Sequence, residues 1–137
     1  MTSEKPILLI EDDRVDAMTV KRALKEIEVG NELIVVGNGE EAISWLQQNS
    51  KSPCIMLLDL NMPKMNGHEF LSVVKNDDNF KCIPVVVLTT SRDDYDKTES
   101  FKKSVAGYMI KPVDYSEFVR LMKTLDAYWT ASELPNN

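Results

Sequence analysis

Residues 54–63 read CIMLLDLNMP, and this stretch decides the fold. Five apolar residues in succession, Cys54–Leu58, are followed directly by an acid, Asp59. A strand that is apolar on both sides is typical of a parallel sheet with helices on both faces, because a sheet with one wet face alternates apolar and polar residues. In such sheets functional groups collect at the carboxyl ends of the strands, where Asp59 would lie.

Four more apolar runs predict the other strands of the same sheet: Ile7–Ile10, Leu33–Val36, Val85–Leu88 and Tyr108–Ile110. The longer stretches between them carry apolar residues at helical spacing, as at Ala17, Val20, Leu24 and Ile27. We therefore expect an α/β fold in which five parallel strands alternate with five helices in a doubly wound sheet. The 137 residues suit a single domain, with a core from about residue 6 to 130 and a flexible tail at 131–137.

The composition narrows the class of protein. A net charge of −6 and a pI of about 4.8 argue against a nucleic-acid binder, because affinity for nucleic acid comes mostly from basic groups. No apolar run approaches the length of a membrane span, and the first residues do not resemble a signal peptide. We expect a cytoplasmic protein in which Cys54 and Cys82 are reduced core thiols.

Polar residues follow four of the predicted strands. They are Glu11, Asp12 and Asp13 after the first, Asp59 and Asn61 after the third, Thr89 after the fourth and Lys111 after the fifth. Clustered carboxylates repel one another, and a hard divalent cation such as Mg²⁺ relieves that repulsion. A carboxylate beside such a cation can attack phosphorus, while a lysine and a threonine hydroxyl receive the charge of the phosphoryl oxygens.

Each of these elements has an ordinary structural interpretation when it stands alone. Acids before a helix usually cap it, an aspartate after a strand usually belongs to a turn, and a Lys-Pro pair is usually a solvated loop. Their occurrence in order, each at the end of a different strand, favours the phosphoryl-transfer interpretation.

The motifs ILLIEDD, LLDLNMPKMNG, IPVVVLTTS and GYMIKP resemble those of response-regulator receiver domains, the chemotaxis-Y-like family of two-component signalling. The resemblance runs from Ile7 to about Trp129 and implies a flavodoxin-like (βα)5 sandwich with strand order 2-1-3-4-5. It implies a phosphorylation switch and not an enzyme, with self-catalysed phosphotransfer and slow autodephosphorylation as its only reactions.

The resemblance also implies roles for individual residues. Asp59 matches the phosphoacceptor. The implied ligands of Mg²⁺, or Mn²⁺, are Glu11, Asp12, Asp59 and Asn61, the last through its backbone carbonyl. Thr89, Tyr108 and Lys111 match the phosphoryl-binding and switch positions, so that Thr89 moves toward the phosphoryl group and the Tyr108 ring turns into the vacated space. The bond before Pro112 is expected to be cis.

A narrower resemblance is to small regulators that partner phytochrome-type histidine kinases, through NDDNFKCIP, LTTS and AYWTASELP. It implies a sensor histidine kinase as partner. The apolar residues Phe118, Met122, Leu125 and Trp129 form a stripe of the last helix that packs on the sheet. The apolar residues beyond it predict a homodimer through the fourth helix, the fifth strand and the fifth helix, whereas Trp45 is assigned to the core.

Other functions remain open at this point. The protein could be a phosphorelay intermediate, or an interaction module on a receiver scaffold that is never phosphorylated. A flavodoxin-like electron carrier is disfavoured, because Glu11, Asp12 and Asp13 would repel the FMN phosphate. A haloacid-dehalogenase-type phosphatase is disfavoured because Asn61 stands where a second aspartate is expected, and a P-loop enzyme because its motif does not occur.

Overall fold

The computed structural model describes residues 4–133 and contains the strands and helices that the sequence predicts. The strands are β1 (Ile7–Ile10), β2 (Leu33–Val36), β3 (Ile55–Leu58), β4 (Val85–Thr89) and β5 (Gly107–Ile110). The helices are α1 (Arg14–Glu26), α2 (Gly39–Gln48), α3 (Gly67–Lys75), α4 (Asp94–Lys102) and α5 (Tyr115–Ala131). All pairings are parallel in the order β2-β1-β3-β4-β5, which confirms the predicted architecture.

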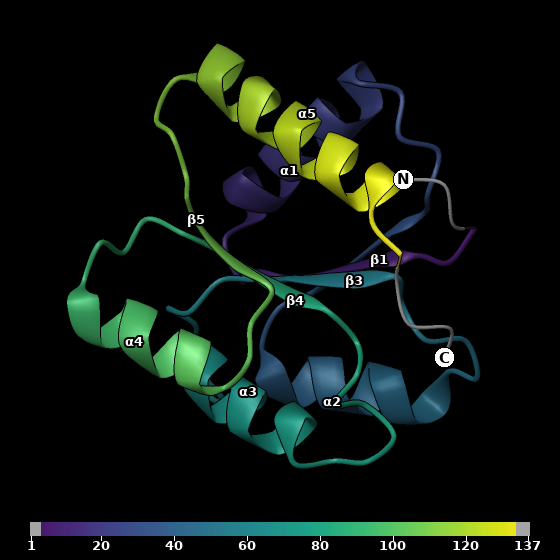
Figure 1. The fold of residues 1–137 in the computed structure, drawn as a ribbon, viewed down its shortest axis with the longest axis vertical. Coiled ribbons are helices and arrows are strands. Elements are labelled where there is room, and N and C mark those ends of the chain that lie inside the picture. The colour runs from purple at the N-terminus through teal and green to yellow at the C-terminus, as the bar shows by residue number, and fades with distance from the viewer. Residues whose placement is uncertain (1–3, 134–137) are drawn as a thin grey trace.

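Helices cover both faces of the sheet, as Figure 1 shows, with α1 and α5 on one side and α2, α3 and α4 on the other. Alternate residues of β1 therefore enter different cores. Ile7 and Leu9 pack with α1 and α5, whereas Leu8 and Ile10 pack with α2 and α3. Since every side chain of this strand faces a helix, the strand is apolar throughout.

Helix α5 packs as its stripe predicts. Phe118, Met122, Leu125 and Trp129 are all buried, whereas Tyr128 is 62% exposed. Trp45 is partly buried and packs against the cluster on the opposite face of the sheet, which agrees with its assignment to the core. Val119 is also buried and Leu121 packs against the same cluster as the stripe, so the exposed apolar surface of α5 is carried by Tyr128.

The expectation about the two cysteines needs correction, and the one about the C-terminal tail lies mostly outside the described residues. Cys54 is buried, but Cys82 is exposed, so the interpretation of both cysteines as core thiols is wrong for Cys82. Cys82 lies in a turn that Lys75 holds, because Lys75 Nζ donates to the carbonyls of the residues on either side of it, Lys81 and Ile83. Ile83 is the buried residue of this turn, and Cys82 before it lies outward. Most of the tail predicted to be flexible lies outside the described residues, and α5 is capped at Ser132.

None of the helices within residues 4–133 combines the length and the apolar character needed to cross a membrane.

Candidate phosphorylation and metal site

Backbone hydrogen bonds align the ends of the strands and bring their polar residues together. The amide of Asp59 donates to the carbonyl of Ile10 over 3.1 Å, which places the end of β3 beside the end of β1. The amide of Lys111 donates to the carbonyl of Thr89 over 2.8 Å, which does the same for β5 and β4. The predicted residues are therefore neighbours because the parallel ladder continues one step past the strands.

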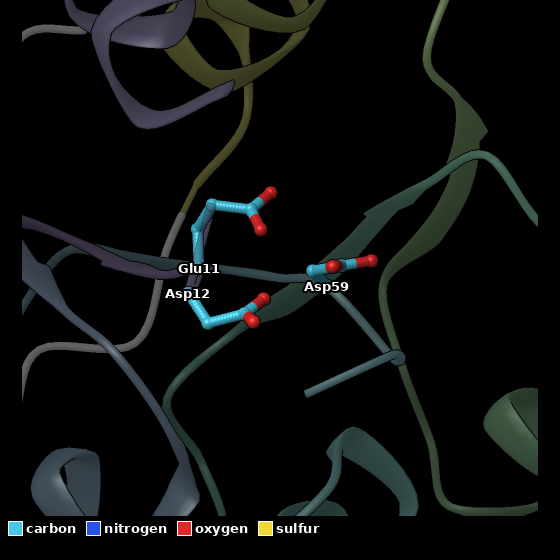
Figure 2. A group of neighbouring side chains, drawn as sticks. All are labelled: Glu11, Asp12 and Asp59. Atoms are coloured by element: carbon cyan, nitrogen blue, oxygen red, sulfur yellow. The ribbon is translucent and has the colours of Figure 1, made fainter. Parts of the chain in front are cut away.

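Three carboxylates meet at this edge of the sheet. Glu11 and Asp12 follow β1 and Asp59 follows β3, and one oxygen from each lies within 4.8 Å of the others (Figure 2). Glu11 is 4% exposed and Asp59 is 9% exposed, so water screens their repulsion poorly. Oxygen donors that approach one another in this way fit a hard divalent cation, which removes the repulsion and accepts carboxylate ligands.

Asp13, the third acid of the run, has a different task. It is the N-cap of α1, where its side chain accepts a hydrogen bond from the amide of Asp16 over 3.0 Å. Its own amide donates to Glu11 Oε2 over 3.2 Å. The capping interpretation of the acidic run therefore applies to Asp13, which satisfies an otherwise unpaired amide of the first turn.

Lys111 is the cation of the site. Its side chain is 9% exposed, and Nζ donates to Glu11 Oε1 and, over 3.1 Å, to Asp16 Oδ2. Burial alone would lower the pKa of Lys111, but the hydrogen bond to Glu11 and the charge of Asp59 raise it above its ordinary value. Lys111 is therefore an ammonium at neutral pH.

Glu11 is the group that titrates near neutrality. Burial raises the pKa of Glu11 to about 7, against the hydrogen bond from Lys111, which lowers it, and the charge of Asp59 raises it further. Since Lys111 keeps its proton throughout this range, proton exchange at the pair takes place on the Glu11 carboxyl. A divalent cation beside Glu11 would displace that proton.

Asp16 is a residue of the site that the sequence does not reveal. It lies in the first turn of α1 and is separated from Lys111 by 95 positions in the chain. An acid in the first turn of a helix is well explained by the helix dipole, so the sequence offers no reason to look further. Only the packing of α1 beside the end of β5 shows that Asp16 shares the Lys111 ammonium with Glu11.

Thr89 and Tyr108 are both hydrogen-bonded to Ser91. Thr89 is fully buried, and its Oγ1 accepts a hydrogen bond from the Ser91 amide over 3.3 Å. The Tyr108 hydroxyl donates to the Ser91 carbonyl over 2.9 Å, and its ring packs against a buried cluster of the core. Ser91 thus connects the two residues that the resemblance assigns to the switch.

Asn61 lies in the segment between β3 and α3, exposed and two residues after Asp59. The shape of this segment depends on Gly67. A Cβ at Gly67 would lie 2.7 Å from Leu60 Cα and 2.9 Å from the Asp59 carbonyl oxygen, closer than such atoms can approach. The Gly67 amide instead donates to the Leu60 carbonyl over 3.0 Å, which closes the segment that carries Asn61.

The bond between Lys111 and Pro112, which was expected to be cis, is trans, as are all peptide bonds in the described part of the chain. The prediction was wrong. The trans form is the intrinsically favoured one for a bond before proline, by about 0.5–1 kcal/mol. With a trans bond, the short connection from Pro112 reaches the N-cap of α5 at Asp114 with Val113 fully exposed.

Comparison with known proteins shows the family of the chain. Residues 7–123 match the family described as the response regulator receiver domain. Response regulator Rcp1 of Synechocystis sp. is 37% identical over 130 residues, which cover 91% of this chain and 88% of that protein. A probable methanogenesis regulatory protein, FilR2 of Methanothrix harundinacea, is 35% identical over 127 residues, or 90% of this chain and 82% of that protein.

Solved structures of similar proteins share the whole fold. The phosphorylated cyanobacterial phytochrome response regulator RcpA superposes with a TM-score of 0.91 at 35% identity, over 98% of this chain and all of that chain. The Mn²⁺-bound form of Rcp1 superposes with a TM-score of 0.88 at 36% identity, over 96% of this chain and 99% of that chain. The fold, the acidic cluster and these matches lead to one conclusion: the chain belongs to the response regulator receiver domain family.

Proposed function

We propose that the protein is a signalling switch whose Asp59 accepts a phosphoryl group from a sensor histidine kinase in a Mg²⁺-dependent reaction. The observation that supports this best is the meeting of three carboxylates, Glu11, Asp12 and Asp59, with the buried ammonium of Lys111. Acids alone would suit a structural cation. The Lys111 ammonium adds a fixed positive charge of the protein itself, and a phosphoryl group, which brings negative charge into the site, requires such a charge.

The carboxylates of Glu11, Asp12 and Asp59, with the backbone carbonyl of Asn61, are the groups that we assign to the cation. Mg²⁺ is the natural occupant because it prefers oxygen ligands, and Mn²⁺, which a solved relative contains, is an alternative. When bound, the metal supplies positive charge that offsets the charge of the phosphoryl oxygens and orients the group for in-line attack.

The remaining steps use side chains of this protein. A carboxylate oxygen of Asp59 attacks phosphorus, an O–P bond forms, and the bond between phosphorus and the histidine nitrogen of the donor breaks. The Lys111 ammonium and the Thr89 hydroxyl receive the charge on the phosphoryl oxygens. Hydrolysis by water later breaks the O–P bond, which returns Asp59, releases inorganic phosphate and resets the switch.

The signal leaves the site through Thr89 and Tyr108. When the Thr89 hydroxyl turns to a phosphoryl oxygen, it ceases to accept from the Ser91 amide. Tyr108, bound to the carbonyl of the same residue, responds to that movement. The surface formed by α4, β5 and α5 then has two states, and phosphorylation shifts the balance between them.

The test is a measurement of mass after incubation with Mg²⁺ and a small phosphodonor. Wild-type protein is expected to gain one phosphoryl group, whereas Asp59→Asn gains none because its amide is not a nucleophile. Asp78→Asn is the matched control, since the Asp78 carboxylate is 92% exposed, and it is expected to behave as wild type. Equal gain by Asp59→Asn would place the phosphoryl group on another residue, and no gain by wild type with any donor or kinase would favour an interaction module.

The donor that we propose is a histidine kinase of the phytochrome type. RcpA is described as a phytochrome response regulator, and another similar structure is a bacteriophytochrome response regulator, at 36% identity over 97% of this chain. We infer that the exchange takes place in the cytoplasm, where kinases find their ATP.

A homodimer through α4, β5 and α5 is the assembly that we propose. Three large apolar side chains of α4 and α5 are exposed: Tyr95 by 68%, Phe101 by 55% and Tyr128 by 62%. Beside Tyr128 lies an apolar hollow of about 250 Å³ between the two last strands and α5. Exposed apolar area of this kind marks an interaction surface in soluble proteins.

Replacing Tyr128 with glutamate is expected to shift the protein toward monomer, because a charge at the centre of an apolar contact costs its desolvation. Sedimentation velocity over a range of concentrations measures the shift. Val15→Glu is the matched control, since Val15 is 72% exposed but lies on α1, outside the proposed surface. The proposal fails if wild type sediments as a monomer with and without a phosphoryl mimic, or if both variants behave alike.

A further inference from the structure

A chain of side-chain hydrogen bonds links helix α3 to β5 outside the acidic site. It begins at His68, the second residue of α3, whose Nε2 lies 2.8 Å from Asp96 Oδ1 in α4. The other oxygen of Asp96, Oδ2, accepts from Ser91 Oγ over 2.6 Å. The Ser91 carbonyl then accepts from the Tyr108 hydroxyl over 2.9 Å. Three short contacts thus join α3, α4 and β5 to the connection after β4, which carries Ser91.

The direction of the first bond follows from burial. His68 Nδ1 is buried and has no hydrogen-bond partner among residues 4–133. A buried N–H without an acceptor is costly, whereas a bare ring nitrogen is less so. We therefore assign the ring proton to Nε2, from which His68 donates to Asp96. The edge of the Tyr95 ring, 6.0 Å away between centroids, packs on the same imidazole.

Asp96 is held in place by its own helix. Its amide donates to Asp93 Oδ1 over 3.3 Å at the N-terminus of α4, and its carbonyl accepts from Ser100 Oγ over 2.7 Å. The hydrogen bond from Ser91 and that from His68 hold the pKa of Asp96 below its ordinary value. The carboxylate is thus a charged, well-oriented acceptor, and charge-assisted hydrogen bonds are about twice as strong as neutral ones.

We propose that Asp96 is a positioning residue of the switch: oriented by His68, it holds Ser91 so that the Ser91 carbonyl receives the Tyr108 hydroxyl and keeps that ring packed inward. All the polar atoms of Ser91 are engaged, since its amide donates to Thr89 Oγ1 and its hydroxyl also accepts from the Asp93 amide. Ser91 is therefore hydrogen-bonded through its amide to Thr89 and through its carbonyl to Tyr108, so a movement of Thr89 can reach Tyr108 through it.

This inference rests on the proposed function, because it assigns Asp96 to the readout of Asp59 phosphorylation. It adds something that the acidic site does not contain. Asp96 and His68 lie on α4 and α3, and within residues 4–133 they make no hydrogen bond or ion pair with Glu11, Asp12 or Asp59. They therefore act on the response of Tyr108 and not on the chemistry. The position of α4 then affects how Tyr108 responds.

The test follows Tyr108 directly by fluorine NMR of protein labelled with fluorotyrosine, in which Tyr108→Phe identifies the resonance. Asp96→Ala is expected to raise the solvent-exposed population of the ring about fivefold, the effect of losing one hydrogen bond of about 1 kcal/mol. His68→Ala is expected to act in the same direction and to add little when Asp96 is already alanine. Asp94→Ala is the control, because the Asp94 side chain is 99% exposed on the same helix.

Far-UV circular dichroism shows which variants are folded, and His68→Ala reaches the same carboxylate from α3 if Asp96→Ala does not fold. An unchanged Tyr108 resonance in a folded variant overturns the inference, as do equal shifts in Asp94→Ala or fully additive effects of the two substitutions. The spectra are recorded without phosphorylation, so they are informative whether or not wild type gains mass with a phosphodonor. If wild type gained no mass with any donor or kinase, that result would overturn the proposed function and not this inference.

Discussion

Replacement of Lys111 with methionine is expected to slow phosphoryl transfer to Asp59 by about 10²–10³-fold, the usual effect of removing one preorganised donor from a site where negative charge develops. Methionine keeps the length of the stem and removes the ammonium. In the wild type that ammonium is buried and forms ion pairs with Glu11 and Asp16. It is also attracted electrostatically by the carboxylate of Asp59. The rate of mass gain with a small phosphodonor measures the effect.

At high pH, where Glu11 is ionised in both proteins, the same substitution is expected to strengthen metal binding, because the ammonium competes with the cation for Glu11. The two effects of Lys111→Met thus have opposite signs, which general damage to the site would not produce. Lys97→Met is the matched control, since Lys97 is 43% exposed and pairs only with Asp94 on the surface of α4 in the contacts of residues 4–133. A transfer rate within twofold of wild type would remove Lys111 from the reaction.

The sequence predicts the fold well because the three central strands, β1, β3 and β4, are buried along their whole length between two layers of helices. Ile7–Ile10 and Leu33–Val36 have the bounds expected from their apolar runs, and Ile55–Leu58 begins one residue later than its run. Polar residues stand at the ends of four of the five strands, so the candidate site follows from the fold. Once the strands are parallel, Glu11, Asp59, Thr89 and Lys111 reach one edge of the sheet.

The sequence does not predict contacts between a helix side chain and a distant element of the fold. Asp16 and Asp96 look like ordinary acids in the first turns of α1 and α4, where the helix dipole is sufficient reason for them. Their partners, Lys111 and His68, are 95 and 28 positions away in the chain. Spacing along one helix shows which face a residue occupies, but not which charged group of another element lies opposite.

Two local expectations failed for a related reason. The cis bond before Pro112 was inferred from resemblance alone, and the isomer of such a bond depends on the tertiary context of its loop, here a connection that is trans. Cys82 stands beside an apolar residue, but it lies in an irregular turn. Such a turn has no helical or strand periodicity from which the direction of a side chain could be predicted. Cys82 lies outward and Ile83 inward.

Metal binding is expected to depend on pH because of Glu11. A pKa of about 7 for Glu11 means that below neutrality the metal-free site holds a proton that the cation must displace. The apparent affinity for Mg²⁺ should rise with pH, by up to about tenfold per unit well below pH 7, and level off above it. Calorimetric titration in two buffers of different ionisation enthalpy measures both the affinity and the proton released.

The same protonation has a consequence for stability, with a definite sign. In the unfolded chain Glu11 titrates near 4.5, so between that value and about 7 the folded metal-free protein binds more protons than the unfolded one. The free energy of unfolding without metal should therefore fall as pH rises through this window, and Mg²⁺ should restore it most at the upper end. Chemical denaturation at several pH values measures this.

Glu11→Gln separates this explanation from a general effect of pH on the acidic edge. The amide cannot titrate, so the variant should lose the released proton and most of the pH dependence of both affinity and stability, although its affinity for Mg²⁺ at pH 8 should be weaker. Glu26→Gln, an exposed change at the far end of α1, should leave both pH dependences as in wild type. If Glu11→Gln kept the full slope, the titrating group would have to be another carboxylate of the cluster. The pairing of Glu11 with Lys111 would then leave Glu11 ionised at all these pH values, and the cation would enter without displacing a proton from it.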